Sequence, residues 1–251
     1  MKRKNLICIF ALACTFFASG SAVAQDEQPL SRYFTKPTPE AVSPDGNGFI
    51  RRWTILEPIS KPNHTNTVFT DSYIREAFAE EHFPNQMTIM PKDGMKVKAK
   101  FTKMEMPKDF RFRMDPKDIK ITTGTEKLIW HKLDSKLYNI KLFRFGEQYI
   151  KRVYGVIYWA ITVIDCPEEM KDVRLAVGSN SASMWWVNGE EALILSGDRR
   201  MVVDDCVSHR INLKKGINVL RGAIINGPGM SDFCVRFMDQ DGNIITNYTI
   251  Q

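Results

Sequence analysis

Short apolar segments separated by turn residues at close intervals are the feature that most constrains the fold of this chain. From residue 95 onward, about a dozen segments have the length and composition of strands. Turn signals divide them at Asn188–Gly189, Lys215–Gly216, residues 226–229 and Asp241–Gly242. Because half-apolar sheets must bury their apolar faces against each other, we predict an all-β fold, an antiparallel β-sandwich or jelly roll.

One short helix and the separate strands follow from local patterns. Thr70, Asp71 and Ser72 offer a helix N-cap, apolar residues follow near one helical face, and Pro84 ends the segment. Strands and helices do not alternate, which argues against a doubly wound fold. The expected strands cover residues 49–56, 95–101, 111–113, 119–122, 128–131, 138–143, 154–164, 173–177, 183–187, 192–195, 201–203, 207–213, 217–225, 233–238 and 244–250.

Residues 1–24 have the pattern of a secretory signal peptide. Lys2, Arg3 and Lys4 precede an apolar run over residues 6–18, and Ala22–Val23–Ala24 forms a small-x-small cleavage site. The run is shorter than the roughly 20 residues that span a bilayer. We expect cleavage after Ala24 and a location in the periplasm or at the cell surface. The alternative is a lipid anchor on Cys14, which follows Leu12 and Ala13.

The remaining chain divides into two parts. Residues 25–47 are polar and contain four prolines, so we expect an irregular lead-in or tether. Residues 48–251 have the length of a single β-sandwich domain, with an insertion near residues 99–124.

Charge argues against nucleic acid as a partner. Of 35 Lys and Arg, three leave with the signal peptide, so 32 remain against 29 Asp and Glu. The excess is concentrated in residues 92–127, which hold 11 Lys or Arg and 6 Asp or Glu. Such a patch could meet an acidic polysaccharide or anionic lipid headgroups, and the alternative is a solvated face.

No nucleophilic signature is present in the sequence. The nearest string to GxSxG is GSNSA at residues 178–182, which has Asn180 at the serine position and Ala182 in place of the second glycine. Four histidines are available as bases: His64, His82, His131 and His209. We interpret His82 and His131 as structural hydrogen-bonding or interface residues, because no Ser or Cys partner is indicated.

Acidic doublets and cysteines do not predict a catalytic or zinc site either. Adjacent residues of a strand point to opposite faces, so Glu190–Glu191 cannot place two carboxyls across one glycosidic bond. Cys166, Cys206 and Cys234 favour buried thiols, with a Cys206–Cys234 disulfide as the alternative. We expect no cofactor, and a structural calcium ion stays open through four carboxylates, those of Asp198, Asp204, Asp205 and Asp232.

The segment SMWWVNGEEAL, residues 183–193, predicts a hairpin at Asn188–Gly189. Alternation places Trp186 on one face of the strand and Trp185 on the other. We assign Trp186 to the core and expect an exposed Trp185 ring on which a sugar could stack.

Residues 173–242 resemble the galactose-binding-like jelly-roll modules attached to bacterial polysaccharide-degrading enzymes and esterases. The matching positions form a strand ending in glycine, Trp-x-Asn-Gly, an Asp-Arg loop, Leu-Lys-x-Gly-x-Asn and Asp-x-Asp-Gly: Gly178, Trp186, Asn188, Gly189, Asp198, Arg199, Leu213, Lys214, Gly216, Asn218, Asp239, Asp241 and Gly242. Residues 49–58 and 130–133 are similar to the first strand and an edge strand of such modules. The resemblance implies carbohydrate binding beside acetylxylan esterases, feruloyl esterases or glycoside hydrolases.

The sequence therefore predicts a secreted, non-catalytic carbohydrate-binding or accessory module of a polysaccharide-degradation system. The expected contacts are the Trp185 ring and four polar side chains: Asp198, Arg199, Arg200 and Asn226. For the two arginines, the alternative is an ion pair with Asp204 or Asp205. Two other classes stay open: a carbohydrate esterase or glycosidase whose site comes from separate loops, and a structural subunit of the cell envelope.

Overall fold

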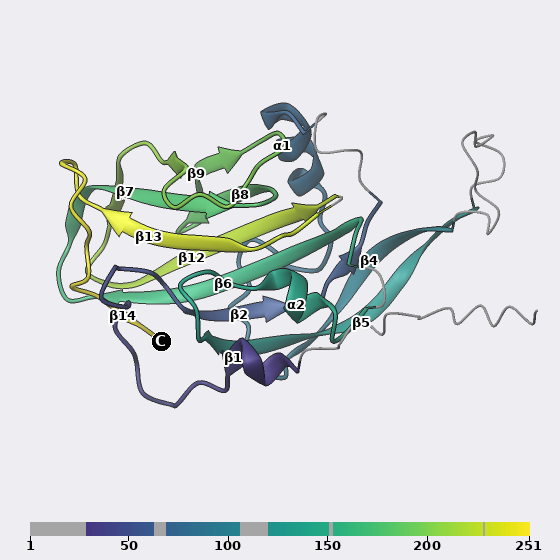
Figure 1. The fold of residues 1–251 in the computed structure, drawn as a ribbon, viewed down its shortest axis with the longest axis horizontal. Coiled ribbons are helices and arrows are strands. Elements are labelled where there is room, and N and C mark those ends of the chain that lie inside the picture. The colour runs from purple at the N-terminus through teal and green to yellow at the C-terminus, as the bar shows by residue number, and fades with distance from the viewer. Residues whose placement is uncertain (1–28, 63–68, 106–119, 151–152, 228) are drawn as a thin grey trace, which may run out of the picture.

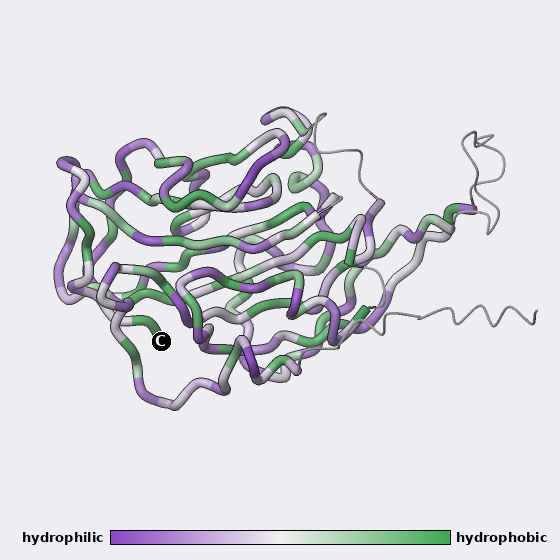
Figure 2. Tube along the Cα trace, viewed as in Figure 1, coloured by the Kyte–Doolittle hydropathy of each residue, from purple (hydrophilic) through white to green (hydrophobic). Residues whose placement is uncertain are grey.

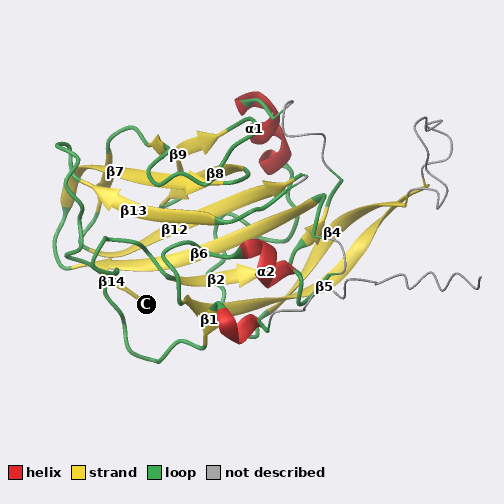
Figure 3. Cartoon of the chain, viewed as in Figure 1, coloured by secondary structure: helices red, strands yellow, loops and turns green. Residues whose placement is uncertain are grey.

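Two antiparallel sheets that face each other across an apolar core form the molecule (Figures 1 and 3). The computed structural model describes residues 29–62, 69–105, 120–150, 153–227 and 229–251. In these residues the predicted all-β antiparallel sandwich is confirmed. The elements are η1 (Leu30–Arg32), β1 (Phe34–Thr35), β2 (Arg52–Leu56), β3 (Ile59–Ser60), α1 (Asp71–Ala79), β4 (Lys96–Glu105), β5 (Lys120–Ser135), α2 (Leu142–Gly146), β6 (Val156–Cys166), β7 (Met170–Ser179), β8 (Ala182–Val187), β9 (Glu190–Leu195), β10 (Cys206–Val207), β11 (Ile211–Leu213), β12 (Gly216–Asn226), β13 (Phe233–Met238) and β14 (Thr249–Ile250).

The larger sheet is built around β6 and β12, which pair along eleven residues each. Its described strands follow the order β1-β5-β2-β6-β12-β8-β9, and β4 pairs with β5 while β3 and β14 pair with β6. In the smaller sheet, β7 is flanked by β13, β10 and β11. The long β6–β12 pair therefore forms the centre of the larger sheet.

Both faces of the larger sheet are buried near its centre. One hydrophobic cluster lies between the two sheets and includes Trp53 of β2, Trp185 of β8 and Phe237 of β13. A second cluster lies on the opposite face of the larger sheet, where α1 and the residues after it cover Trp159 and Trp186. Apolar residues accordingly run along the central strands, and hydrophilic residues gather in the connections (Figure 2).

Helix α1 is the short helix predicted from the sequence. The side-chain oxygen of Thr70 accepts a hydrogen bond from Tyr73 N at 3.3 Å, as expected of an N-cap. Ile74 and Phe78, four residues apart, are the buried residues of the helix and point onto the larger sheet. The helix thereby covers the outer face of the larger sheet and buries the side chains beneath it.

Four predicted strands differ in the structure. Residues 207–213 are divided between β10 and β11. Residues 138–141 form a bend with a single bridge from Ile140 to Phe233, and residues 142–143 begin α2, in which Leu142 and Phe145 are one helical turn apart and both buried. Residues 201–203 lie outside any strand, and of residues 244–250 only β14 pairs as a strand. Of the predicted strands 119–122 and 128–131, residues 120–122 and 128–131 are parts of the single strand β5, and residue 119 lies outside the described residues.

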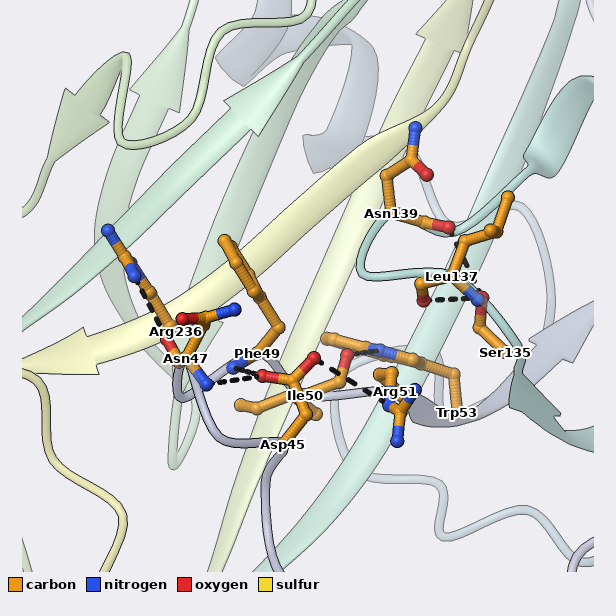
Figure 4. A network of polar contacts seen from close by, with 10 residues as sticks. All are labelled: Asp45, Asn47, Phe49, Ile50, Arg51, Trp53, Ser135, Leu137, Asn139 and Arg236. Carbon is orange, nitrogen blue, oxygen red and sulfur yellow. Dashed lines mark hydrogen bonds and ion pairs between the residues drawn. The ribbon is translucent and has the colours of Figure 1, made fainter.

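The lead-in joins the sandwich through an ordered turn before β2 (Figure 4). The Asp45 carboxylate accepts hydrogen bonds from Asn47 N and Phe49 N, both at 3.0 Å. Arg236 of β13 donates to Asn47 O at 2.9 Å, which ties this turn to the smaller sheet. Upstream, β1 pairs with the end of β5, and Phe34 is buried in the core between the sheets. The residues from 29 to 47 therefore pack on the domain.

Strands β4 and β5 form a long hairpin that extends beyond the sandwich (Figure 1). The expected insertion at residues 99–124 lies in this hairpin. The predicted strand 111–113, His64 and residues 1–24 with Cys14 lie outside the described residues. At the base of the hairpin, Lys100 N donates to His82 O at 2.8 Å, so β4 is anchored to the segment after α1.

His82 makes folding stability depend on pH. Its side chain is fully buried, Nε2 lies 3.0 Å from Ala77 O, and burial lowers the pKa of the imidazole below its ordinary 6.5. Below about pH 6.5 His82 is protonated in the unfolded chain but remains largely unprotonated in the folded chain. The free energy of unfolding therefore decreases as the pH falls. We expect the free energy of unfolding in urea to be lower at pH 5.5 than at 7.5. This difference should shrink in His82→Gln, and an unchanged difference would contradict the assignment.

Candidate functional site

Trp185, the ring expected to face a ligand, is fully buried. It lies in the cluster between the sheets, with its ring centroid 6.0 Å from that of Trp53 and 5.1 Å from that of Phe233. Its indole Nε1 donates to Ser183 Oγ at 2.9 Å. The prediction that the Trp185 ring is exposed is therefore wrong, because the smaller sheet covers the face of β8 on which it lies.

Trp186 is also buried, as predicted, but in the second cluster. Its ring is stacked on that of Trp159 at 5.7 Å with an interplanar angle of 9°. Phe78 of α1 contacts it edge-on from above the sheet. Alternation does put the two indoles on opposite faces, and each face has its own cover.

The polar residues predicted to contact sugar are not gathered in one cavity. Arg199 pairs with Asp205 and donates to Ser196 O at 2.9 Å, so the ion-pair alternative is confirmed for this arginine. Asp198 and Arg200 are exposed in the same loop. Asn226 is fully buried at the end of β12, where its Nδ2 donates to Val153 O at 2.7 Å. Asn226 therefore stabilises the fold from inside.

The carboxylates considered for calcium have cationic partners in three cases. Asp204 pairs with Arg236, Asp205 with Arg199, and Asp232 with Lys141 at 2.8 Å. In the described part of the chain, no three His, Cys, Asp or Glu side chains are grouped to hold a metal ion. Within that part, these side chains therefore offer no assembled metal site.

The three cysteines are free thiols. Cys166 and Cys234 are buried as expected, and Cys206 is half-buried. Burial raises the pKa of the Cys234 thiol to about 11, which keeps it protonated and unreactive at neutral pH. The Cys206–Cys234 disulfide is absent, since the two residues pair with neighbouring positions on opposite sides of β7.

A groove of about 560 Å³ beside β5 is the best candidate for a ligand site. It lies along β5 between the residues that pair with β4 and those that pair with β1. Its volume is within the range of about 300–1,000 Å³ typical of small-ligand pockets. The lining comes from β5, the β1 region, the turn before β4 and the segment after α2: Leu30, Ser31, Phe34, Thr35, Lys36, Asp93, Gly94, Ile129, His131, Lys132, Leu133, Lys136 and Tyr149.

His131 is held at the groove between a carboxylate and a phenol. Its Nε2 lies 3.0 Å from Glu57 Oε1, and because a carboxylate only accepts, Nε2 carries a hydrogen. Glu57 is itself fixed, since its Oε2 accepts from Ile129 N at 3.0 Å. On the other side Tyr149 Oη lies 3.4 Å from Nδ1, and the two rings are 4.7 Å apart. The carboxylate and the phenol thus hold the His131 ring from both sides, and the contact also orients the Tyr149 ring.

Tyr149 combines an accessible ring with an available acceptor. Its side chain is 38% exposed at the groove. Partial burial and the nearby Glu57 and Asp93 carboxylates raise the pKa of Tyr149 to about 12, so the phenol stays neutral. The phenol can donate one hydrogen bond and accept others, so its oxygen retains hydrogen-bonding capacity for a ligand hydroxyl. A neutral ring with one polar edge suits stacking on a sugar better than nucleophilic attack.

Sequence reasoning recognised His131 but not the site around it. The sequence indicates no Ser or Cys partner for this histidine, and Glu57 follows the predicted strand 49–56 without a motif of its own. Glu57 and Tyr149 are distant from His131 along the chain, and they meet it because β2 pairs with β5 and α2 folds back over that pair.

Comparison with protein-family models, curated proteins and solved structures finds no match to this chain. The resemblance to galactose-binding-like modules therefore stays a prediction. Among the described residues, none of the helices is long and apolar enough to cross a membrane.

Proposed function

We propose that this protein is a secreted, non-catalytic β-sandwich that binds carbohydrate in the groove beside β5 and serves a polysaccharide-degrading system. The observation that carries the proposal is the oriented Tyr149 ring, 38% exposed in a groove of about 560 Å³. Around it are groups that recognise hydroxyls: the Tyr149 oxygen, the hydroxyl of Ser31 and the ammonium of Lys36. The family resemblance adds a second, independent reason for carbohydrate.

Affinity electrophoresis through gels containing xylan, pectin or other plant polysaccharides tests this function. Tyr149→Ala should weaken retardation by about tenfold or more, since aromatic anchors in a pocket commonly carry most of the binding energy. Tyr149→Phe, which keeps the ring, should lie between the wild type and the alanine variant. Tyr138→Ala is the matched control, because this tyrosine is similarly exposed at 42% but lies against Phe49 outside the groove. Equal retardation of Tyr149→Ala and the wild type would refute the site.

A hydrolase is the second candidate, and the carboxylate beside His131 favours it. Glu57 orients the imidazole as an acidic partner orients a catalytic histidine, and Ser31 and Thr35 line the same groove. Release of acetate or nitrophenol from sugar esters by the purified protein, abolished in His131→Ala, would establish this activity. It would also refute the non-catalytic proposal.

A further inference from the structure

The hairpin formed by β4 and β5 has one face lined with lysines. The register pairs Lys96 with Ile129, Lys98 with Lys127 and Lys100 with Thr125, and these six side chains share one face of the two-stranded ribbon. We call the four cations Lys96, Lys98, Lys100 and Lys127 the lysine face. All four are exposed to solvent.

The charge of the lysine face is not neutralised within the part of the chain that the structure describes. None of its four ammonium groups forms an ion pair there. On the opposite face of the same hairpin, Lys103 is paired with Glu126 at 3.0 Å. Lys98 and Lys127 are directly opposite each other, and like charges at directly opposed positions destabilise a sheet. The local cost of this pair is relieved when an anion lies between them.

The lysine face continues into the groove. Lys127, Ile129 and His131 alternate along β5 and therefore lie on one face of the strand, and both Ile129 and His131 line the groove. From Thr125 to His131 the strand covers about 20 Å at roughly 3.4 Å per residue. The Tyr149 ring in the groove and the four lysines of the lysine face thus belong to one extended surface.

We propose that this surface binds an acidic polysaccharide, with one sugar at Tyr149 and the carboxylate or sulfate groups of the following sugars on the lysine face. The inference rests on the proposed carbohydrate-binding function and adds the class of ligand. Threonine hydroxyls on the same face supply further hydrogen-bonding groups, Thr125 opposite Lys100 and the Thr102–Thr123 pair next along the hairpin. A row of cations and hydroxyls beside a stacking ring fits a charged glycan better than an anionic membrane, which would favour a broad apolar face.

The test compares acidic and neutral polysaccharides on the full chain. In Lys98→Gln/Lys127→Gln, affinity for polygalacturonate should fall about tenfold at low salt, because two surface ion pairs are lost. Affinity for neutral xylan should stay the same. The matched control is Lys214→Gln/Lys215→Gln, which removes two exposed lysines from the turn between β11 and β12 and should change neither. Thermal unfolding should show no loss of stability in the Lys98/Lys127 variant, since it removes a repulsive pair.

Each outcome supports or overturns one of the two proposals. If the Lys98/Lys127 variant binds polygalacturonate as tightly as the wild type, or if the control loses as much affinity, the proposed role of the lysine face is refuted. Tyr149-dependent binding of neutral polysaccharide without preference for the acidic one overturns the lysine face and keeps the proposed function. Binding of phosphatidylglycerol vesicles in place of polygalacturonate, lost in the Lys98/Lys127 variant, would make the surface a lipid site and overturn the inference. Binding to no polysaccharide at all overturns both.

Discussion

Trp185→Ala should lower the free energy of unfolding by about 3–5 kcal/mol, the usual cost of deleting a fully buried tryptophan. The ring is in contact with Trp53 and Phe233, and its indole nitrogen is hydrogen-bonded to Ser183. Removing it leaves a cavity in the cluster between the sheets together with an unpaired, buried Ser183 hydroxyl. The loss is measured by urea unfolding, followed by the fluorescence of the remaining tryptophans and by circular dichroism.

Polysaccharide retention separates this structural role from the ligand contact that the sequence predicted. At a temperature where Trp185→Ala is still folded, its retention should equal that of the wild type, because the ring has no accessible face. Trp185→Phe is the milder variant and should lose less stability, since an aromatic ring still fills most of the space. A folded Trp185→Ala that no longer binds polysaccharide would show that the indole contacts ligand after all.

Gly222→Ala should be the next most destabilising change, at about 1–3 kcal/mol, through overpacking. Gly222 is paired with Trp185 across β12 and β8, and the indole lies over the glycine. An added Cβ would be 2.4 to 2.7 Å from three carbons of the Trp185 ring, closer than any real contact. β12 is paired on both sides at this position, so the backbone has little freedom to move away.

A double-mutant cycle tests whether the indole is the reason for the glycine. In the Trp185→Ala background the space above Gly222 is empty, so Gly222→Ala should cost clearly less there than in the wild type. Gly46→Ala is the matched control, since no atom lies within 4 Å of its added Cβ, and it should leave stability nearly unchanged. Additive effects of the two substitutions would contradict the packing argument.

The candidate site shows how far residue patterns reach toward function. Two adjacent tryptophans on a strand suggest a surface on which a sugar ring could stack, yet both Trp185 and Trp186 belong to the core. The ring that does face a groove is Tyr149, in a segment without strand periodicity or a binding motif. Its ring is oriented by His131 of β5, which is itself held by Glu57 directly after β2. Contacts between residues so distant along the chain have no local signature.

The lysines of the β4–β5 hairpin could be predicted in part from the sequence. Their concentration in residues 92–127 was visible in the sequence, and both a solvated face and an anionic partner were open. The strand register decides which lysines share a face: Lys98 and Lys127 are opposed and unpaired, whereas Lys103 is neutralised by Glu126. Register depends on the pairing of two segments, and for that reason composition alone could not distinguish the two faces.

Local physics determined the elements of this fold. Turn glycines, alternation of apolar residues and the Thr70 cap are properties of neighbouring residues, so they predicted an antiparallel sandwich with a short helix, and they placed Trp185 and Trp186 on opposite faces. Only the tertiary structure decided what covers each face. Alternation along a strand shows which side chains share a face of the sheet. It predicts an exposed face only where one side of the sheet is in contact with solvent. Here α1 and the smaller sheet cover both sides at β8, and the candidate groove lies instead along β5, between its pairing with β4 and its pairing with β1.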